Sequence, residues 1–282
     1  MSLNTQGNIE MKSTVRVLIL GDVVGVPGRM MLQKHIARLK QEFNIDAVIV
    51  NGENSNNNGR GITSRIAEFF MHNGVDVITT GNHIWDQNEI YEYMKNNTNM
   101  IRPANFAAEC PGSGVTTFNC NGNLIAVVNI QGRVFMKEHL DCPFKVMDTM
   151  LSFLKHKTNI IIVDMHAEAT AEKICLGFYL DGRVSCVVGT HTHVATADER
   201  ILPNGTAYVT DLGMAGSLNS SIGMKKDLMI ERFKSQMPNK FMVESQPPFV
   251  MTGIWVEIDT KTGKAIQIQR VKVIDEDLPA AT

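Results

Sequence analysis

Side chains that can bind a metal ion follow several apolar stretches of this sequence, each at the point where the stretch ends. They carry carboxylate, amide or imidazole groups, and their positions are Asp22, Glu53, Asn54, Asn82, His166, His191 and His193. Any one of them alone is a weak signal, because an acidic or amide residue after a strand is commonly a turn or capping residue. Because several strand ends agree in ligand type, we expect these side chains to converge on one metal site.

The mixture of ligand types limits which metal the site could hold. Carboxylate, amide and imidazole groups without a thiolate suit manganese, iron, zinc or nickel, and the set is too rich in nitrogen for calcium. Seven donors exceed the need of one tetrahedral zinc, and they suit two divalent or trivalent ions about 3.5–4 Å apart that share a carboxylate and a bridging water. Such a pair activates the water and neutralises charge on phosphoryl oxygens, so we expect hydrolysis of phosphate esters.

Two of these ligands alternate with threonine in the segment Gly189-Thr-His191-Thr-His193. Alternate residues of an extended segment project to the same side. We therefore expect His191 and His193 to aim their imidazoles at one centre.

A further histidine, His83, lies next to the proposed ligand Asn82. An imidazole can be protonated when it meets a substrate, so we expect His83 to donate a proton to the leaving oxygen. Asp86 could hold its other ring nitrogen. The alternative is that His83 only orients a metal ligand.

Two residues near these positions are weaker candidates for substrate contact. Arg29 follows a glycine-containing turn at 25–28 that feeds a helix N-terminus, and it could contact an anion. Trp85 could stack on a base or pack beneath the metal loop. The asparagine-rich loop 54–60 could contact a nucleotide or be a solvated loop.

Apolar runs and amphipathic stretches alternate along the first two thirds of the chain. The runs are rich in β-branched residues, as is typical of strands buried on both faces, and they cover residues 15–20, 47–50, 75–80, 124–128, 160–163 and 186–189. Apolar spacings of three and four predict helices over 29–43, 64–73 and 144–157, with Thr63 as an N-cap. Strands that alternate with helices predict a largely parallel core, and ligands gather outside the carboxyl ends of its strands.

The last third of the chain predicts strands over 205–210, 249–258 and 265–274, the final two forming an antiparallel pair that turns at 260–263. Together the elements predict an α/β fold, a four-layer α/β/β/α sandwich with mixed sheets. Residues 212–248 show little apolar periodicity and are expected to form a long loop or small helical excursion near the site. We expect a disordered leader over 1–13 and a single domain over 14–282.

Composition narrows the class of protein. The chain has 282 residues, of which 44% are hydrophobic and 20% charged, with a formal net charge of −2. This composition is typical of a globular protein, and it lacks the strong positive charge of proteins that bind extended nucleic acid or an anionic membrane. A small nucleotide or RNA-derived phosphate remains a suitable substrate. Five cysteines without CxxC spacing and the lack of a long apolar run predict a cytoplasmic protein. The chain has seventeen methionines, and exposed ones could form a subunit interface, so a homo-oligomer is one expectation.

Five of the segments above, taken in order, resemble the motifs of the calcineurin-like metallophosphoesterases. They are Gly21-Asp22, Gly52-Glu53-Asn54, Gly81-Asn82-His83, the strand end at His166 and Gly189-Thr-His191-Thr-His193. Two departures are informative: Val24 stands where the family has a histidine, and Glu53 stands where it has a bridging aspartate. With Gly-Asn-His-Ile-Trp-Asp (81–86) and Thr-Asp-Leu-Gly-Met (210–214), these departures resemble the YmdB-like branch of bacterial phosphodiesterases.

That resemblance implies roles for the ligands. Glu53 would bridge two ions; Asp22, Asn54 and His193 would complete the shell of one ion, and Asn82, His166 and His191 that of the other. It also implies an iron-containing centre and hydrolysis of 2′,3′-cyclic nucleotides.

Two rival functions remain open at the level of sequence. A phosphomonoesterase or 5′-nucleotidase could use the same metal pair, since the pair attacks either kind of ester. A regulatory, RNA-linked protein with a weakly active metal centre would bind without turnover.

Overall fold

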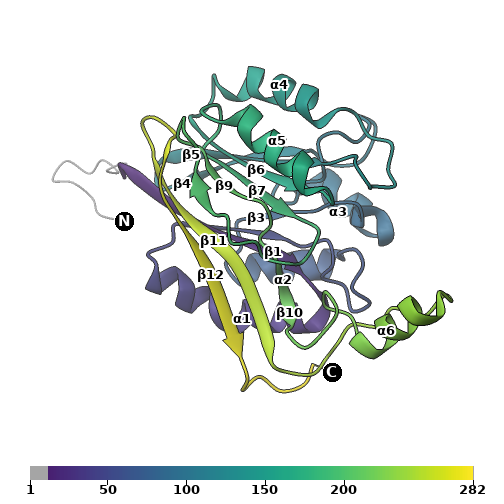
Figure 1. Cartoon of the computed structure of the whole chain (residues 1–282). Helices are drawn as coiled ribbons and strands as arrows, with labels where there is room; N and C mark the ends of the chain where they lie inside the picture. Colours follow the sequence, from purple (N-terminus) through teal and green to yellow (C-terminus); the bar gives the residue numbers. More distant parts are fainter. Residues whose placement is uncertain (1–11, 282) are drawn as a thin grey trace.

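The computed structural model describes residues 12–281, which form two stacked sheets with helices on both outer faces (Figure 1). Most of the expected leader, residues 1–11, lies outside the described residues. Its last two residues are described and lie against the body of the protein. Lys12 forms an ion pair with Asp46, and the carbonyl of Ser13 accepts a hydrogen bond from the amide of Thr260.

The first sheet has six strands in the order β12, β11, β10, β1, β2 and β3. They are β1 (Thr14–Val23), β2 (Ala47–Asn51), β3 (Val77–Thr79), β10 (Met214–Ser217), β11 (Phe249–Asp259) and β12 (Ala265–Asp275). β1 is parallel to β2 and β10, and β2 is parallel to β3, whereas β11 is antiparallel to its neighbours. The carboxyl ends of β1, β2 and β3 therefore meet at one edge.

The second sheet also has six strands, in the order β4, β5, β6, β7, β9 and β8. They are β4 (Val115–Cys120), β5 (Asn123–Gln131), β6 (Ile160–His166), β7 (Cys186–Thr190), β8 (Arg200–Ile201) and β9 (Ala207–Val209). The inner four strands are parallel, and the antiparallel strands β4 and β8 form the two edges. Both sheets are thus mixed, as predicted.

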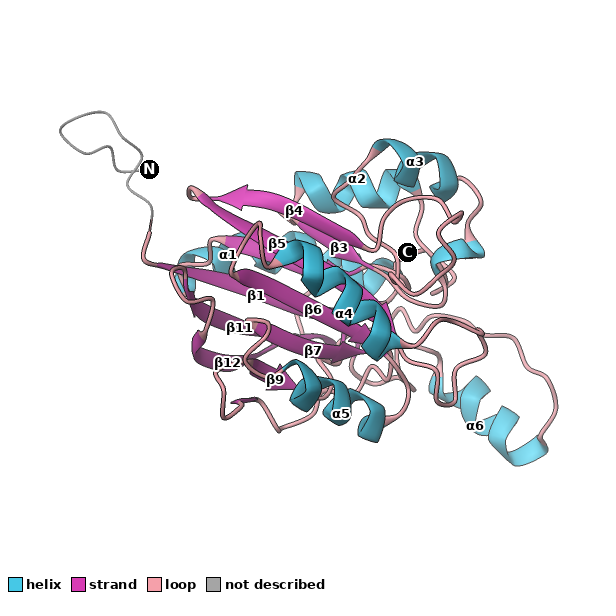
Figure 2. Cartoon of the chain, turned by 90° about the horizontal axis from the view of Figure 1, so that it is seen from above, coloured by secondary structure: helices cyan, strands magenta, loops and turns pink. Residues whose placement is uncertain are grey.

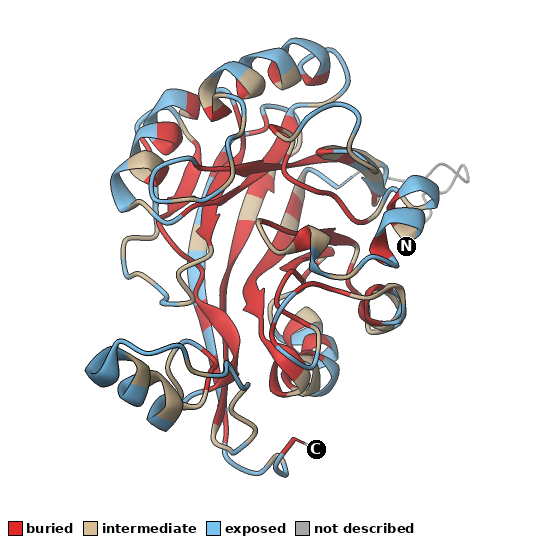
Figure 3. Ribbon diagram, turned by 90° about the vertical axis from the view of Figure 1, so that its right-hand side faces the viewer, coloured by how far each residue is buried: buried red, intermediate tan, exposed pale blue. Residues whose placement is uncertain are grey.

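Successive side chains of β1 face opposite sides of the first sheet, and this shows how the layers form. Leu18 and Leu20 pack toward helices α1 (Gly25–Glu42) and α2 (Ser64–His72), whereas Val17 and Ile19 face the core between the sheets. On the other side, α4 (Pro143–Leu154) and α5 (Thr170–Leu180) cover the second sheet (Figure 2). Figure 3 shows the buried residues concentrated along the strands. The predicted four-layer α/β/β/α sandwich is confirmed.

Residues 212–248 differ in part from the expectation of a long loop or small helical excursion. Met214–Ser217 forms the buried strand β10, parallel to β1 in the first sheet. Four residues are too few to show a hydrophobic periodicity in the sequence. This segment is therefore a strand because it pairs with β1 and β11, and not because of its local pattern. The helical part of the expectation is confirmed by α6 (Lys226–Ser235), which has no buried residue and projects from the body (Figures 1 and 2).

The first helix begins at Gly25, four residues before the predicted start at 29, so the glycine-containing segment is its first turn and not a preceding loop. Gly28 allows α1 to lie close to β10, because a Cβ at this position would lie 2.4 Å from the carbonyl oxygen of Ala215. The 3₁₀ helix η1 (Ile84–Asp86) and α3 (Ile90–Asn96) complete the elements. Among residues 12–281, no helix is both long and apolar enough to cross a membrane.

Candidate metal centre

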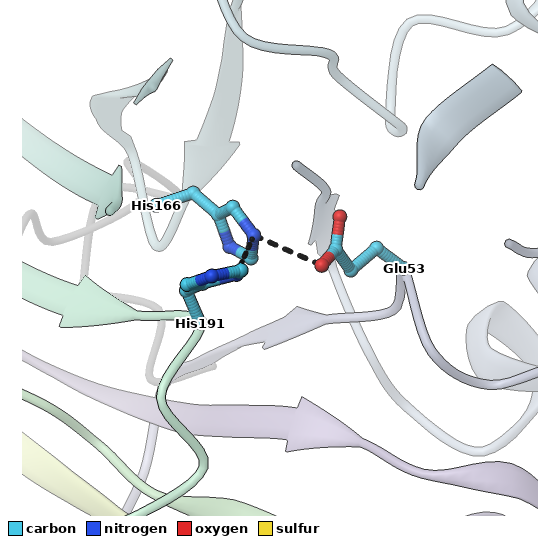
Figure 4. A group of neighbouring side chains, drawn as sticks. All are labelled: Glu53, His166 and His191. Carbon is cyan, nitrogen blue, oxygen red and sulfur yellow. Dashed lines mark hydrogen bonds and ion pairs between the residues drawn. The ribbon is translucent and has the colours of Figure 1, made fainter. Parts of the chain in front are cut away.

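All seven proposed ligands lie at the carboxyl ends of the parallel strands. Asp22 is near the end of β1, Glu53 and Asn54 follow β2, and Asn82 follows β3. The second sheet contributes the histidines: His166 ends β6, while His191 and His193 follow β7. Figure 4 shows Glu53 facing His166, with His191 beside them. The site therefore joins the two sheets.

The first ligand cluster surrounds Nε2 of His166. This nitrogen lies 2.9 Å from Oε1 of Glu53 and 3.0 Å from Nδ1 of His191 (Figure 4). It also lies 3.0 Å from Oδ1 of Asn82. His166 and Glu53 are buried. The ring of His166 needs the space beside Gly81, because a Cβ there would lie 2.2 Å from the imidazole. Three ligands are thus assembled around one buried nitrogen.

The hydrogen bonds behind His166 determine what this nitrogen presents. The Thr190 hydroxyl donates to Asp164 at 2.7 Å, so its oxygen accepts from Nδ1–H of His166 at 3.0 Å. The Nε2 atom then carries a lone pair unless the ring takes up a second proton. Burial disfavours that proton, but the charge and hydrogen bond of Glu53, together with the charges of Asp22 and Asp164, outweigh burial and raise the pKa of His166 to about 9. The cluster thus attracts one positive charge, which a metal ion can supply instead of a proton.

The other two members of the first cluster are held in ligand form. Burial would raise the pKa of Glu53, but His166 and the backbone amide of His83 lower it to about 2, so Glu53 stays ionised. Burial, followed by the charge of His166, lowers the pKa of His191 to about 3, so its imidazole stays neutral. A carboxylate and a neutral imidazole are the forms that bind metals.

The second ligand cluster contains Asp22, Asn54 and His193. Nε2 of His193 lies 3.2 Å from Oδ1 of Asn54 and 3.8 Å from Oδ1 of Asp22. Its Nδ1–H donates to the carbonyl of Ile222 at 2.9 Å, so Nε2 carries the lone pair. Oδ1 of Asp22 is buried and has no hydrogen-bond partner among the described residues, and burial raises the pKa of Asp22 to about 6. An unpartnered buried oxygen beside an imidazole lone pair suits a cation.

The segment that holds His191 and His193 is not extended, which corrects the expectation of two rings on one side of a strand. β7 ends at Thr190, and His191 and His193 have φ values of 97° and 64°. These left-handed turns send His191 to the cluster of His166 and His193 to that of Asn54. Such conformations are costly for residues with a Cβ and persist only where the surroundings hold them.

Sequence reasoning missed the buried ion pair that holds this segment. Nζ of Lys173, on α5, lies 2.6 Å from Oδ2 of Asp211, and both residues are buried. The same oxygen of Asp211 accepts the hydroxyl of Thr192 at 2.8 Å, and Asp22 accepts the amide of His191 at 3.0 Å. Asp211 could have been found in the segment 210–214, but Lys173 has no motif around it.

His83 lies at the margin of the first cluster. Its backbone amide donates to Oε2 of Glu53 at 3.0 Å, and its Nδ1 lies 3.0 Å from Oδ2 of Asp86. The expected contact with Asp86 is therefore present. The contact engages one ring nitrogen and leaves Nε2 of His83 for another partner. Arg60 approaches the same carboxylate at 3.8 Å.

The two weaker candidates have packing roles in the structure. Arg29 donates to the carbonyl of Ser55 and, at 2.8 Å, to Oδ1 of Asn57, so it braces the asparagine-rich loop. Trp85 packs edge-on against Tyr91 and Phe106, with ring centroids 5.5 and 5.8 Å away. The role of Trp85 in stacking on a base stays a prediction.

A pocket of about 360 Å³ opens beside the two ligand clusters. Its lining residues come from the loops that carry the proposed metal ligands, from α6 and from the segments on either side of α6. They are Glu53, Asn54, Gly59, Arg60, His83, Glu168, His191, Thr192, His193, Ile222, Met224, Met229 and Phe241. Neither Arg29 nor Trp85 is among the described residues that line it. The arrangement can therefore hold a small phosphate ester against the metal ligands.

Comparison with known proteins gives matches over nearly the whole chain. A family model described as "YmdB-like protein" matches residues 18–271. The 2′,3′-cyclic-nucleotide 2′-phosphodiesterase of Bacillus subtilis (strain 168) is 44% identical over 264 residues, which are 94% of this chain and 99% of that protein.

Two solved structures are similar over comparable lengths. A hypothetical protein of Thermus thermophilus has a TM-score of 0.86 and 35% identity, covering 93% of this chain and 100% of that one. A structure of a novel phosphatase of Mycoplasma pneumoniae has a TM-score of 0.88 and 35% identity, covering 95% and 96%. All the segments that form the site fall within residues 18–271, which the family model matches.

Proposed function

Because this chain belongs to the YmdB-like family of phosphodiesterases and phosphatases, it is a hydrolase of phosphoester bonds, and we propose that it hydrolyses 2′,3′-cyclic nucleotides. The observation that carries the proposal is the pair of ligand clusters, one around His166 and one around Asp22, beside a pocket of nucleotide size. The name of the Bacillus subtilis relative supports this substrate class.

The family implies divalent metal ions, and the two clusters fit them. In the proposal, Asp22, Asn54 and His193 would hold one ion, and Asn82, His166 and His191 would hold the other. Glu53, whose carboxylate is buried and ionised, would help to hold both. Iron is our choice by resemblance, and the same ligands suit manganese, zinc or nickel. Bound there, the ions would activate water and neutralise charge on the phosphoryl oxygens.

The residues around the ions orient the substrate and supply a proton. Water adds to phosphorus while the bond from phosphorus to the 2′ oxygen breaks, which leaves a 3′-phosphate. In the proposal, His83 donates a proton to the departing 2′ oxygen, because it lines the pocket and Asp86 engages only its Nδ1. Arg60, which approaches Asp86 and lines the same pocket, would attract the phosphate.

A diester fits the charges of the pocket better than a monoester does. Among the described residues that line the pocket, Arg60 is the one lysine or arginine. A terminal phosphate carries nearly two negative charges and a diester carries one, so a monoesterase or 5′-nucleotidase would be expected to have further cationic groups here. The proposal therefore ranks the phosphodiesterase above the phosphomonoesterase.

A cytoplasmic location belongs to the same proposal. The five cysteines are all unpaired, and Cys120 and Cys186 are buried. Unpaired cysteines are usual in a compartment that keeps thiols reduced.

The test supplies purified protein with Mn²⁺ or Fe²⁺ and compares 2′,3′-cyclic AMP, bis-p-nitrophenyl phosphate and p-nitrophenyl phosphate. We expect turnover of both diesters, formation of adenosine 3′-monophosphate and little cleavage of the monoester. A preference for the monoester would support the phosphomonoesterase. Binding without turnover of any of the three would support the regulatory protein.

A further inference from the structure

The lining of the pocket beside the metal ligands has two chemically different parts. One part consists of metal ligands and His83. The other part is apolar, and it consists of Ile222, Met224, Met229 and Phe241. These four residues, which we call the apolar wall, belong to α6 and the segments on either side of it. A molecule that fills this pocket must therefore carry a charged part and a flat or apolar part.

Phe241 is the aromatic member of the apolar wall and remains 42% exposed. The guanidinium of Arg232 lies 4.6 Å from its ring centroid, in a cation–π contact. The contact joins Phe241 to α6, which carries Arg232. An aromatic ring that is held in this way and still exposed in a pocket is suited to stack on a second flat ring.

The apolar wall is fixed in position relative to the metal ligands. The carbonyl of Ile222 accepts the Nδ1–H of His193, so one segment orients a ligand and contributes to the wall. Met224 pairs in a β-bridge with Val243, and the amide of Lys225 donates to the carbonyl of Met242 at 2.8 Å. These contacts tie together the two chain segments that flank α6. The distance from the metal ligands to the wall is therefore set by the fold.

Resting on the proposed function, we propose that the apolar wall binds the nucleobase of the substrate, with Phe241 as its stacking platform. The phosphate then lies at the metal ligands, and the ribose spans the middle of the pocket. The side chains of the wall carry no hydrogen-bond donor and no strong acceptor that could read a base edge. The wall therefore accepts all four bases and favours purines, which offer the larger stacking surface.

The test compares 2′,3′-cyclic AMP with a base-free analogue, the 2′,3′-cyclic phosphate of methyl riboside. The variant is Phe241→Ala, and the matched control is Phe233→Ala, because Phe233 is 74% exposed on α6 and does not line the pocket. We expect Phe241→Ala to lower the ratio of kcat/KM for the two substrates by about 5- to 100-fold, mainly through KM. Phe233→Ala should leave the ratio unchanged, and Phe241→Tyr should restore it.

A binding measurement separates this inference from the proposed function. Adenosine 3′-monophosphate and methyl riboside 3-phosphate are titrated into the wild type and into Phe241→Ala by calorimetry, with circular dichroism to verify folding. Loss of affinity for the adenosine compound alone supports the apolar wall, even if the wild type cleaves neither cyclic substrate and the proposed function fails. Equal ratios and equal affinities in the wild type and Phe241→Ala would overturn the inference.

Discussion

At the scale of single residues, the candidate metal centre brings together buried hydrogen-bond acceptors that have too few donors. Nε2 of His193 points its lone pair toward Oδ1 of Asp22, which has no hydrogen-bond partner among residues 12–281. Nε2 of His166 faces the carboxylate of Glu53 and two further ligands. Leaving such groups unpaired costs about 1–3 kcal/mol each, so added positive charge stabilises the arrangement.

Replacing His83 with alanine tests its role as proton donor. The ring of His83 lines the pocket, and we do not include it among the metal ligands. We expect His83→Ala to keep its metal content by elemental analysis while kcat for 2′,3′-cyclic AMP falls about 10²- to 10⁴-fold. Asp86→Asn, which weakens the hold on Nδ1, should cause a smaller loss. A rate near that of the wild type would remove His83 from the proposed chemistry.

Replacing Lys173 with methionine tests the buried ion pair behind the histidine segment. The change leaves the carboxylate of Asp211 buried without its cation, and we expect a loss of about 3–5 kcal/mol in the free energy of unfolding. Urea denaturation measures this loss, and Lys145→Met, at an exposed position on α4, is the control. Adding Asp211→Asn to Lys173→Met should recover part of the stability. An equal loss in both lysine variants would show that the pair has no special role.

At the scale of elements, sequence pattern predicts the strands that are apolar and buried on both faces. β2, β6 and β7 are examples, and the residues that follow or end them supply Glu53, His166 and His191. β10 was missed because its four residues acquire their structure from neighbouring strands. The division of ligands into two clusters could not be derived from spacing, since it depends on left-handed turns at His191 and His193. Those turns are fixed by contacts with residues far away in the chain.

A buried carboxylate joins helix α1 to the end of β12 and gives a prediction about pH. Oδ2 of Asp275 lies 2.7 Å from both Lys34 Nζ and His35 Nε2, and its Oδ1 accepts the amides of Asp277 and Leu278 at 3.0 Å. Burial would raise the pKa of Asp275, but these partners lower it to about 2. Because the unfolded value is about 3.9, the carboxylate stabilises the fold fully above about pH 4. The contribution is lost as the pH falls through the folded-state value.

Asp275→Asn should therefore destabilise the protein by about 2 kcal/mol at pH 7, as measured by urea denaturation. The gap between variant and wild type should narrow as the pH is lowered from 5 toward 2. Asp227→Asn on the exposed helix α6 is the control, with no pH-dependent gap expected. A gap of constant size across this range would contradict the assigned cause.

At the scale of the whole molecule, the centre lies where the carboxyl ends of two sheets meet. The first sheet and its loops supply the carboxylates and amides, and the second supplies the three histidines. Bound ions would therefore link the two halves of the sandwich. Helix α6 and the residues that follow it expose Ile230, Phe233 and Met237. The homo-oligomer expected from the methionine content stays a prediction.

Removal of the metal should lower the stability of the whole fold. An ion that binds the folded chain alone, at a concentration 1,000 times its dissociation constant, adds about 4 kcal/mol. For a chain of this size that corresponds to a fall in Tm of roughly 10 °C after treatment with EDTA, measured by calorimetry. Asp22→Asn should shrink the EDTA-induced shift, because it removes the charge of a buried ligand. His156→Gln, at an exposed position, should keep the full shift. If metal-loaded wild-type protein has the same Tm before and after chelation, then the two sheets are held together without the ions, and the ligand clusters contribute to chemistry alone.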